Sequence, residues 1–148
     1  MFEDSRGRIW IGTYEGGAGA GVGCFDGKRW TRFTRRDGLI DDRVYCMFID
    51  SRKKMWFGTE CGVSRYDGTS WRSFTKTDGL VENLVRAILE DKEGSLWLGT
   101  YPYEQNKGGI SIVRYAGKPE TLQEKLQKLL PQSGEIVRLG PRKKLGKL

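Results

Sequence analysis

The side chains of this sequence that could do chemistry are mostly carboxylates placed at regular intervals. Asp4, Asp50 and Asp91 each stand six residues before a tryptophan, and Asp26 and Asp67 each precede a glycine. Carboxylates can act as general acid and base, and clustered oxygen ligands can hold calcium. No Asp-x-Asp-x-Asp cluster occurs, and each of these residues stands among turn-forming residues. The pattern therefore favours β-turns in which the carboxylate binds backbone N–H groups.

Other kinds of reactive group are scarce. The 148 residues include no histidine, which excludes His-based acid–base catalysis, Ser/His and Cys/His nucleophile pairs, and most zinc sites. Cys24, Cys46 and Cys61 show no CxxC spacing, so we expect small buried or half-buried residues and no disulfide framework. The glycine-rich run 16–21 lacks the Gly-Lys-Ser/Thr ending of a phosphate-binding loop. We expect no catalytic residue, no metal site and no cofactor.

The tryptophans that follow the aspartates mark an internal repeat. The segment Trp10-Ile11-Gly12-Thr13 recurs at residues 56–59 and at residues 97–100. The Asp-Gly-Leu of residues 37–39 recurs at 78–80, and Phe25-Asp26-Gly27 recurs as Tyr66-Asp67-Gly68. Insertions fall at residues 15–22 in the first unit and 101–107 in the third, directly after the Gly-Thr. Loops accept insertions more readily than strands, so this place is predicted to be a loop.

Each repeat unit predicts four short strands. Aromatic and β-branched residues, separated by turn residues, indicate strands at 44–50, 55–59, 63–66 and 70–75 of the second unit. The Asp-x-x-Gly segments predict hairpin turns with glycine at a positive φ, a position that Lys53 takes in the second unit. The glycine after each tryptophan (Gly12, Gly58 and Gly99) predicts close backbone approach or a bulge.

The motif Asp-x-x-Gly-x-φ-Trp-φ-Gly-Thr, followed by Tyr/Phe-Asp-Gly, Trp and Asp-Gly-Leu, resembles the two-component regulator propeller repeat. The resemblance covers about residues 1–118 and implies an all-β chain. We expect an incomplete β-propeller arc of about three four-stranded antiparallel blades, with a short C-terminal helix and a basic tail. The blades are expected at about 1–36, 43–77 and 84–118. The third unit shows three strands before the pattern ends, which predicts eleven strands in all.

The composition changes after residue 118, and we treat 119–148 as a C-terminal segment. Leucines at 122, 126, 129 and 130 predict an amphipathic helix of about ten residues that ends before Pro131. Residues 116–148 hold eight Lys/Arg and three Glu, so most of the net charge of +7 lies here. We expect a solvated tail, with contact to nucleic acid or anionic lipid as the alternative.

Positions that differ between the units are better candidates for a ligand site than positions that recur. The recurring residues are assigned to structure, with the tryptophans packed between blades: Trp10, Gly12, Trp56, Gly58, Trp97, Gly99, Asp4, Asp50 and Asp91. The candidate ligand-binding residues lie in the two insertions after the Gly-Thr: Tyr14, Glu15, Tyr101, Tyr103, Glu104 and Gln105.

The resemblance implies a non-catalytic sensor module that binds a small ligand, a glycan or a protein. Proteins with this repeat are typically bacterial sensors whose propeller is a periplasmic input domain of a membrane-anchored parent with a histidine kinase output. The alternative is an enzyme similar to the streptogramin lyases, but those enzymes rely on histidine, which is absent here. Scaffolding or nucleic-acid contact through the basic tail is a third possibility, although we expect no nucleic acid as partner.

The first unit aligns from within its first strand, so we expect this chain to be a fragment of a longer sensor. The exposed faces of such an arc would be covered either by the remaining blades of the parent or by self-association. The chain shows no apolar run of the ~18 residues that a membrane span needs. Its first residues also lack the basic region and apolar stretch of a signal peptide.

Overall fold

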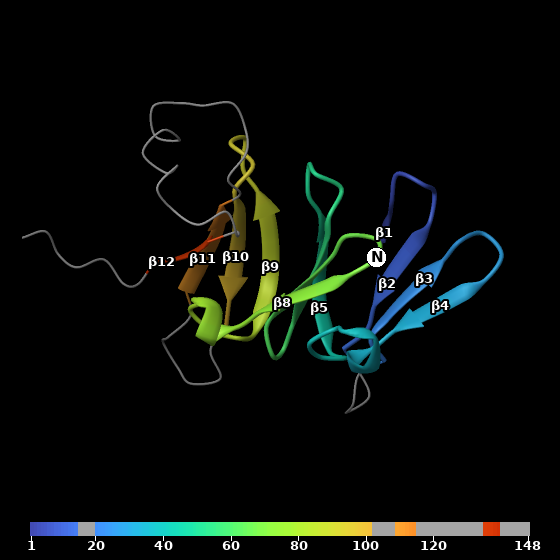
Figure 1. Ribbon diagram of the computed structural model, residues 1–148, viewed down its shortest axis with the longest axis horizontal. Coiled ribbons are helices and arrows are strands. Elements are labelled where there is room, and N and C mark those ends of the chain that lie inside the picture. Colours follow the sequence, from blue (N-terminus) through green and yellow to red (C-terminus); the bar gives the residue numbers. More distant parts are fainter. Residues whose placement is uncertain (15–19, 102–108, 115–134, 140–148) are drawn as a thin grey trace, which may run out of the picture.

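Three four-stranded antiparallel sheets stand side by side in the order in which the chain forms them (Figure 1). The computed structural model describes residues 1–14, 20–101, 109–114 and 135–139. The strands of blade 1 are β1 (Phe2–Glu3), β2 (Ile9–Gly12), β3 (Val22–Phe25) and β4 (Trp30–Phe33). Those of blade 2 are β5 (Val44–Ile49), β6 (Met55–Thr59), β7 (Val63–Tyr66) and β8 (Trp71–Phe74). Those of blade 3 are β9 (Val85–Glu90), β10 (Leu96–Thr100), β11 (Gly109–Arg114) and β12 (Glu135–Leu139).

The strand count corrects the expectation of eleven. The segment β12 pairs antiparallel with β11, with Ile110 opposite Leu139 and Arg114 opposite Glu135, and completes the third sheet. The repeat comparison missed this strand because it lies beyond residue 118 and lacks the Trp-x-x-Phe pattern of β4 and β8. An open strand edge presents unpaired N–H and C=O groups, so a segment from elsewhere in the chain can pair with it. The predicted helix at 121–130 and the basic end at 140–148 lie outside the described residues.

The hairpin turns follow the predicted chemistry. Oδ1 of Asp50 accepts the backbone N–H groups of Arg52 and Lys54, and Oδ1 of Asp4 does the same for Arg6 and Arg8. The glycine position of the turn has a φ of 63° at Lys53, the one non-glycine residue with positive φ in the described part of the chain. The turn geometry therefore holds in blade 2 even though a lysine replaces the glycine.

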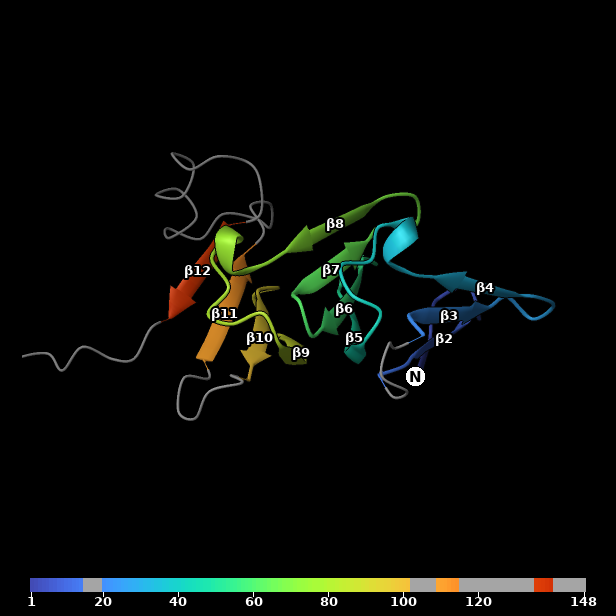
Figure 2. The same ribbon diagram turned by 90° about the horizontal axis from the view of Figure 1, so that it is seen from below.

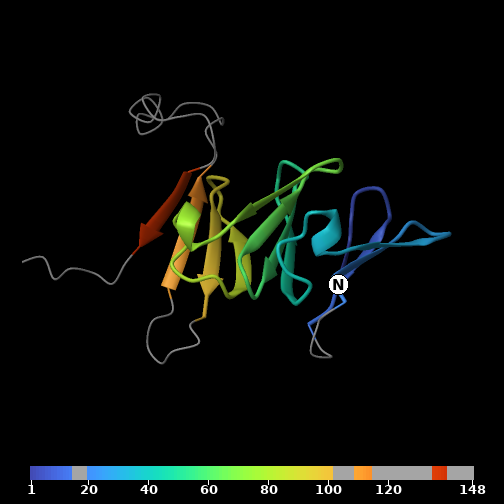
Figure 3. The same cartoon turned by 60° about the horizontal axis from the view of Figure 1, so that its bottom comes forward.

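Two linkers connect the blades, each opened by one 3-10 turn. These are η1 (Arg35–Asp37) and η2 (Lys76–Asp78), which lie at the junctions between sheets (Figure 2). Thr34 and Thr75 cap them, and the following glycines adopt a left-handed conformation. Figure 3 shows both turns on the same side of the row of sheets. The Asp-Gly-Leu repeat is thus a turn that ends one blade and directs the chain to the next.

The hydrophobic core consists of the layers between blades. Trp10 is fully buried and stacks on Phe33 of its own blade, with ring centroids 5.6 Å apart. The rings of Phe57 and Tyr66 in blade 2 lie 6.1 and 6.2 Å from it. Trp56 is likewise fully buried and belongs to a cluster with residues of blade 3 such as Leu98. Trp97 faces away from blade 2 and is only partly buried.

The glycine after each tryptophan allows the next blade to approach. A Cβ on Gly58 would lie 2.8 Å from the carbonyl oxygen of Val85 and would also collide with Cys46 Sγ. A Cβ on Gly12 would lie 2.7 Å from Cγ1 of Val44 in blade 2. Contacts shorter than 3.0 Å would force the backbone apart, so the predicted close approach is confirmed at these two glycines.

Candidate functional site

The predicted ligand-binding residues follow β2 and β10 in the sequence. Tyr14 and Tyr101 are at the ends of the described segments there, and both side chains are exposed. Glu15, Tyr103, Glu104 and Gln105 lie outside the described residues. The backbone N–H of Tyr101 donates to Leu84 O at 2.9 Å, which ties this loop to the linker that precedes β9.

Tyr14 and Tyr101 belong to one row of stacked side chains that crosses all three blades. Tyr14 stacks on Tyr45 of blade 2, with ring centroids 5.5 Å apart and planes 25° apart. The guanidinium of Arg86 from blade 3 lies 5.0 Å from the Tyr45 ring centre and 5.3 Å from that of Tyr101. We call Tyr14, Tyr45, Arg86 and Tyr101 the aromatic strip. Cation–π contacts of this kind stabilise the row and hold the arginine in place.

Charged residues of blade 2 support the strip from one side. The Tyr45 hydroxyl donates to Glu60 Oε2 at 3.3 Å, and Arg43 Nη1 pairs with the same oxygen at 2.6 Å. Arg43 Nε also donates to Asp41 Oδ1 at 3.2 Å. Burial raises the pKa of the Tyr45 phenol, and the Glu60 carboxylate raises it further. Tyr45 therefore stays neutral and fixed at neutral pH.

Arg86 is the part of the strip with free donors. Its side chain is exposed, and no hydrogen bond or ion pair joins it to a described residue. A guanidinium can stack its face on an aromatic ring and still donate hydrogen bonds from the N–H groups in its plane. The fork of N–H groups matches a carboxylate in two-point hydrogen bonding. The strip can therefore bind a ring by stacking and an acid by hydrogen bonds.

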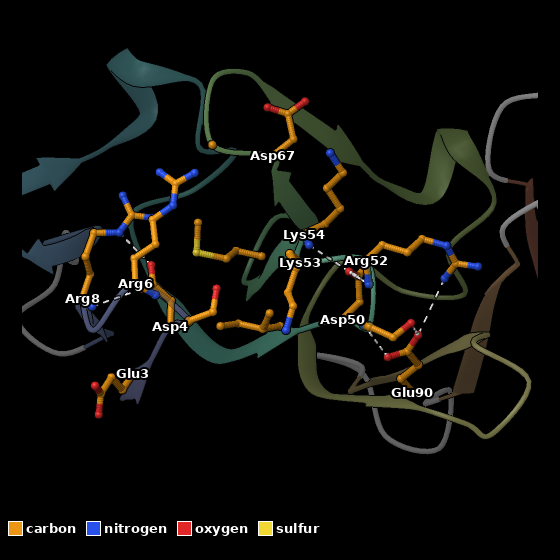
Figure 4. A pocket seen from close by; sticks show the side chains of 15 residues that line it. Glu3, Asp4, Arg6, Arg8, Asp50, Arg52, Lys53, Lys54, Asp67 and Glu90 are labelled. Atoms are coloured by element: carbon orange, nitrogen blue, oxygen red, sulfur yellow. Dashed lines mark hydrogen bonds and ion pairs between the residues drawn. The ribbon is translucent and has the colours of Figure 1, made fainter.

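A second concave region lies at the opposite ends of the strands, between the β1–β2 and β5–β6 hairpins (Figure 4). This hairpin groove has a volume of about 800 Å³, with Ile49 and Met55 among its lining residues. Its wall carries five basic and five acidic side chains: Arg6, Arg8, Arg52, Lys53, Lys54, Glu3, Asp4, Asp50, Asp67 and Glu90. The groove therefore carries no net formal charge.

Four of the five carboxylates of the hairpin groove, those of Asp4, Asp50, Asp67 and Glu90, accept hydrogen bonds from neighbouring residues. Asp4 Oδ2 accepts the indole N–H of Trp10 at 2.9 Å and an Arg8 N–H at 2.7 Å. Burial would raise the pKa of Asp4, but hydrogen bonds from Trp10, Arg8 and Arg6 lower it to about 2. Glu90 accepts both the N–H and the hydroxyl of Ser51. The Asp4 carboxylate, whose pKa is lowered in this way, is a poor proton donor near neutral pH.

No metal-binding arrangement is present in the parts of the chain that the structure describes, since no three His, Cys, Asp or Glu side chains converge there. The same segments contain no helix that is long and apolar enough to cross a membrane.

Sequence reasoning found the two ends of the aromatic strip and missed its centre. Tyr45 and Arg86 follow Val44 and Val85, so they occupy the same position in two repeat units and differ in identity. Tyr14 and Tyr101 were predicted as site residues because their positions differ between the repeat units. The same criterion, used on the first strand of each unit, identifies Tyr45 and Arg86. The contact between them required the tertiary structure, because it joins two different sheets.

Comparison with known proteins links the repeats to one family. The family model for the two component regulator propeller matches residues 1–15, 38–61 and 79–101. A search of curated proteins finds no match.

Two solved structures share the fold. One is the extracellular domain of the hybrid two component system BT3049 from B. thetaiotaomicron, with 29% identity, a TM-score of 0.62, and coverage of 75% of this chain and 14% of that one. The other is PorZ, a bacterial surface component of the type-IX secretion system of Porphyromonas gingivalis, with 21% identity and a TM-score of 0.60. This chain covers 18% of the length of PorZ.

The three matched segments each contain one Trp-φ-Gly-Thr motif, and the matched structures are propeller domains many times longer than this chain. The fold, the repeats and the family model agree on a sensor-type propeller module. The chain therefore contains repeats of the two component regulator propeller type.

Proposed function

We propose that this chain is a non-catalytic input module of a bacterial two component signalling protein, and that it binds a ring-bearing acidic ligand such as a uronate-containing saccharide. The aromatic strip is the binding site. We place the module in the periplasm, outside the membrane that anchors the parent protein. The kinship with an extracellular domain of a hybrid two component system supports this placement.

The observation that carries the proposal is the position of Arg86. Its guanidinium lies within 5.3 Å of two tyrosine ring centres, while its N–H groups have no partner among the described residues. Tyr14 and Tyr101 at the two ends of the strip are 53% and 60% exposed. Exposed aromatic rings and a stacked arginine are typical of recognition surfaces, because they bring contact area with little loss of side-chain entropy.

The strip also suggests how binding would be transmitted. Its four residues come from three separate blades, so a ligand lying along the strip contacts all three blades at once. A ligand that contacts several blades favours the arrangement that it fits best and shifts the population toward it. In the parent sensor that shift would alter the pairing of subunits.

Isothermal titration of the purified chain with an oligogalacturonate, and with a neutral oligosaccharide of the same length, tests the proposal. We expect the acidic oligosaccharide to bind and Arg86→Ala to weaken it at least tenfold, since a charged hydrogen-bonding pair contributes about 1.5–3 kcal/mol. Tyr101→Ala should weaken both saccharides, because it removes a stacking face.

Arg72→Ala is the matched control. Arg72 lies over the ring of Phe74 at 5.1 Å, so it makes the same kind of contact in another part of blade 2. Equal affinities of the Arg86 and Arg72 variants would overturn the strip as the site. Failure of both saccharides to bind would overturn the ligand class.

A further inference from the structure

The hairpin groove exposes its cations more than its carboxylates. The side chain of Asp4 is 7% exposed, whereas that of Arg8, which pairs with it, is 27% exposed. Glu90 and Arg52 form a second pair of this kind, in which the side chains are 11% and 26% exposed. Asp50 is almost completely buried. A ligand that enters the groove therefore meets more basic than acidic surface, although the groove carries no net formal charge.

The groove also holds hydrogen-bond donors that no described residue uses. No hydrogen bond or ion pair joins a described residue to the side chains of Ser5, Arg6, Lys53 and Lys54. Most of the acids are engaged, as in Asp67, whose pKa is lowered by hydrogen bonds from Ser70 and Thr69. Glu3 is the one groove carboxylate without such a bond among the described residues. Because donors exceed open acceptors, the groove favours an anionic ligand.

The basic side chains belong to the two hairpins that form the groove and not to the hairpin fold itself. The turn of blade 1 has Arg-Gly-Arg at residues 6–8, and that of blade 2 has Arg-Lys-Lys at 52–54 (Figure 4). The equivalent turn of blade 3 has Glu-Gly-Ser at 93–95 and lies outside the groove. It is closed by the same kind of aspartate bond, from Ser95 N–H to Asp91 Oδ1. The cations are therefore not needed to form the turn.

Lys53 stands where the backbone favours glycine. Its φ is 63°, and the equivalent Gly7 and Gly94 have φ values of 74° and 81°. A side chain in this left-handed region is strained. The Lys53 side chain is exposed, so it does not offset the strain by burial in the core. Strain that is retained at such a position points to a use for the side chain.

From these observations we infer that the hairpin groove binds a phosphoryl group between the β1–β2 and β5–β6 turns. Arg6 offers a fork of N–H groups, and Lys53 and Lys54 act as point charges. A phosphate carries more charge and more acceptor oxygens than a carboxylate, so it can pair with several of these cations at once. The groove lies at the opposite ends of the strands from the aromatic strip, and this inference does not depend on ligand binding at the strip.

Titration of the full chain with inorganic pyrophosphate tests the inference, at an ionic strength of about 0.15 M where surface charges are screened within about 8 Å. We expect Lys53→Gly to weaken binding about three- to fivefold, the usual contribution of one exposed ion pair. The same change relieves backbone strain, so a loss of binding would not be due to unfolding. Arg6→Ala combined with Lys53→Gly should weaken binding at least tenfold.

Two further variants distinguish the groove from a general response to charge. Lys92→Ala removes an exposed cation from the blade 3 hairpin outside the groove, and Arg86→Ala removes one from the aromatic strip. Both should leave the affinity for pyrophosphate unchanged. Glu3→Gln should increase it, because the change removes an exposed negative charge from the groove. Equal weakening in Lys92→Ala and Lys53→Gly would overturn the inference.

Vesicles of phosphatidylcholine with and without phosphatidic acid show whether the phosphoryl group belongs to a lipid or to a soluble ester. Cosedimentation that requires phosphatidic acid, and that the Arg6→Ala, Lys53→Gly double variant loses, would assign the groove to a lipid phosphate. Binding of pyrophosphate alone would assign it to a soluble ester. Failure of the chain to bind either probe would overturn the inference, as would equal binding by the double variant.

Discussion

The indole Nε1–H of Trp56 donates to Asp50 Oδ2 over 2.9 Å inside blade 2. Both residues are almost completely buried, at 0% and 2% exposed. Because Oδ1 of the same carboxylate accepts the backbone N–H groups of Arg52 and Lys54, Asp50 closes the β5–β6 hairpin and orients the tryptophan together. The pairs Asp4–Trp10 and Asp91–Trp97 repeat the bond at 2.9 and 2.7 Å.

Removal of this shared acceptor should cost much of the stability of the chain. Asp50→Ala is expected to lower the free energy of unfolding by about 3 kcal/mol, because a buried indole N–H and two amides lose their acceptor. Urea denaturation at constant m-value measures the change. The control is Asp26→Ala, an exposed turn carboxylate that accepts two amides, for which we expect about 1 kcal/mol or less. Similar losses in the two variants would contradict the structural role of the Asp–Trp bond.

Acid should destabilise the protein through Asp4. Its pKa falls from the usual 3.8 to about 2 on folding, so the unfolded chain binds more protons in that range. The contribution of Asp4 to stability is complete above about pH 4 and is lost as the pH falls toward 2. Urea midpoints measured from pH 6 to 2 should decline less steeply in Asp4→Asn, which should also be less stable at pH 6. Parallel declines in both chains would show that Asp4 does not contribute.

Replacing Lys53 should stabilise the protein. Lys53 has a φ of 63°, where the equivalent Gly7 and Gly94 have 74° and 81°. A side chain in the left-handed region costs about 1–2 kcal/mol, so Lys53→Gly should raise the free energy of unfolding by about 1 kcal/mol. Lys54→Gly is the control: φ there is not positive, and the added flexibility should lower stability by about 0.5–1 kcal/mol. A stability loss in Lys53→Gly would contradict this account.

The three free cysteines should differ in reactivity. Cys61 is exposed, whereas Cys24 is buried and Cys46 is partly buried. Burial raises the pKa of the Cys46 thiol to about 12, so it carries almost no thiolate at neutral pH. In native protein at pH 8 a disulfide reagent should label Cys61 first, and all three residues should react in denaturant. Fast labelling of Cys46, mapped by mass spectrometry, would show that blades 2 and 3 separate readily, because Cys46 Sγ faces the Val85 carbonyl oxygen.

The periodic features of this protein could be predicted from its sequence because each depends on neighbours along the chain. The three copies of the Trp-φ-Gly-Thr segment predicted the three blades. Within blade 2, the strand predicted at 55–59 has the same bounds as β6 (Met55–Thr59). The Asp-x-x-Gly turns depend on a carboxylate that binds amides two and four residues away. Such local interactions are determined by residue type and spacing alone.

The features that escaped prediction join parts of the chain that are far apart. The strand β12 pairs with β11 across residues 115–134, and no recurring motif marks it. The constant spacing between Asp50 and Trp56 was visible, but the indole bond that requires it appeared only when the hairpin placed the two side chains together. The aromatic strip was visible only as two isolated tyrosines in separate loops.

By itself, the sequence determined the repeat unit, its four-stranded form and the turns within it, because these depend on the order of apolar, polar and glycine residues over a few positions. The tertiary structure decided which units face one another, and so brought Tyr14, Tyr45, Arg86 and Tyr101 into one row and left the Trp30 side chain exposed. Contacts between sheets depend on how the sheets pack in three dimensions. The spacing of residues along the chain does not determine which residues of two sheets lie close together.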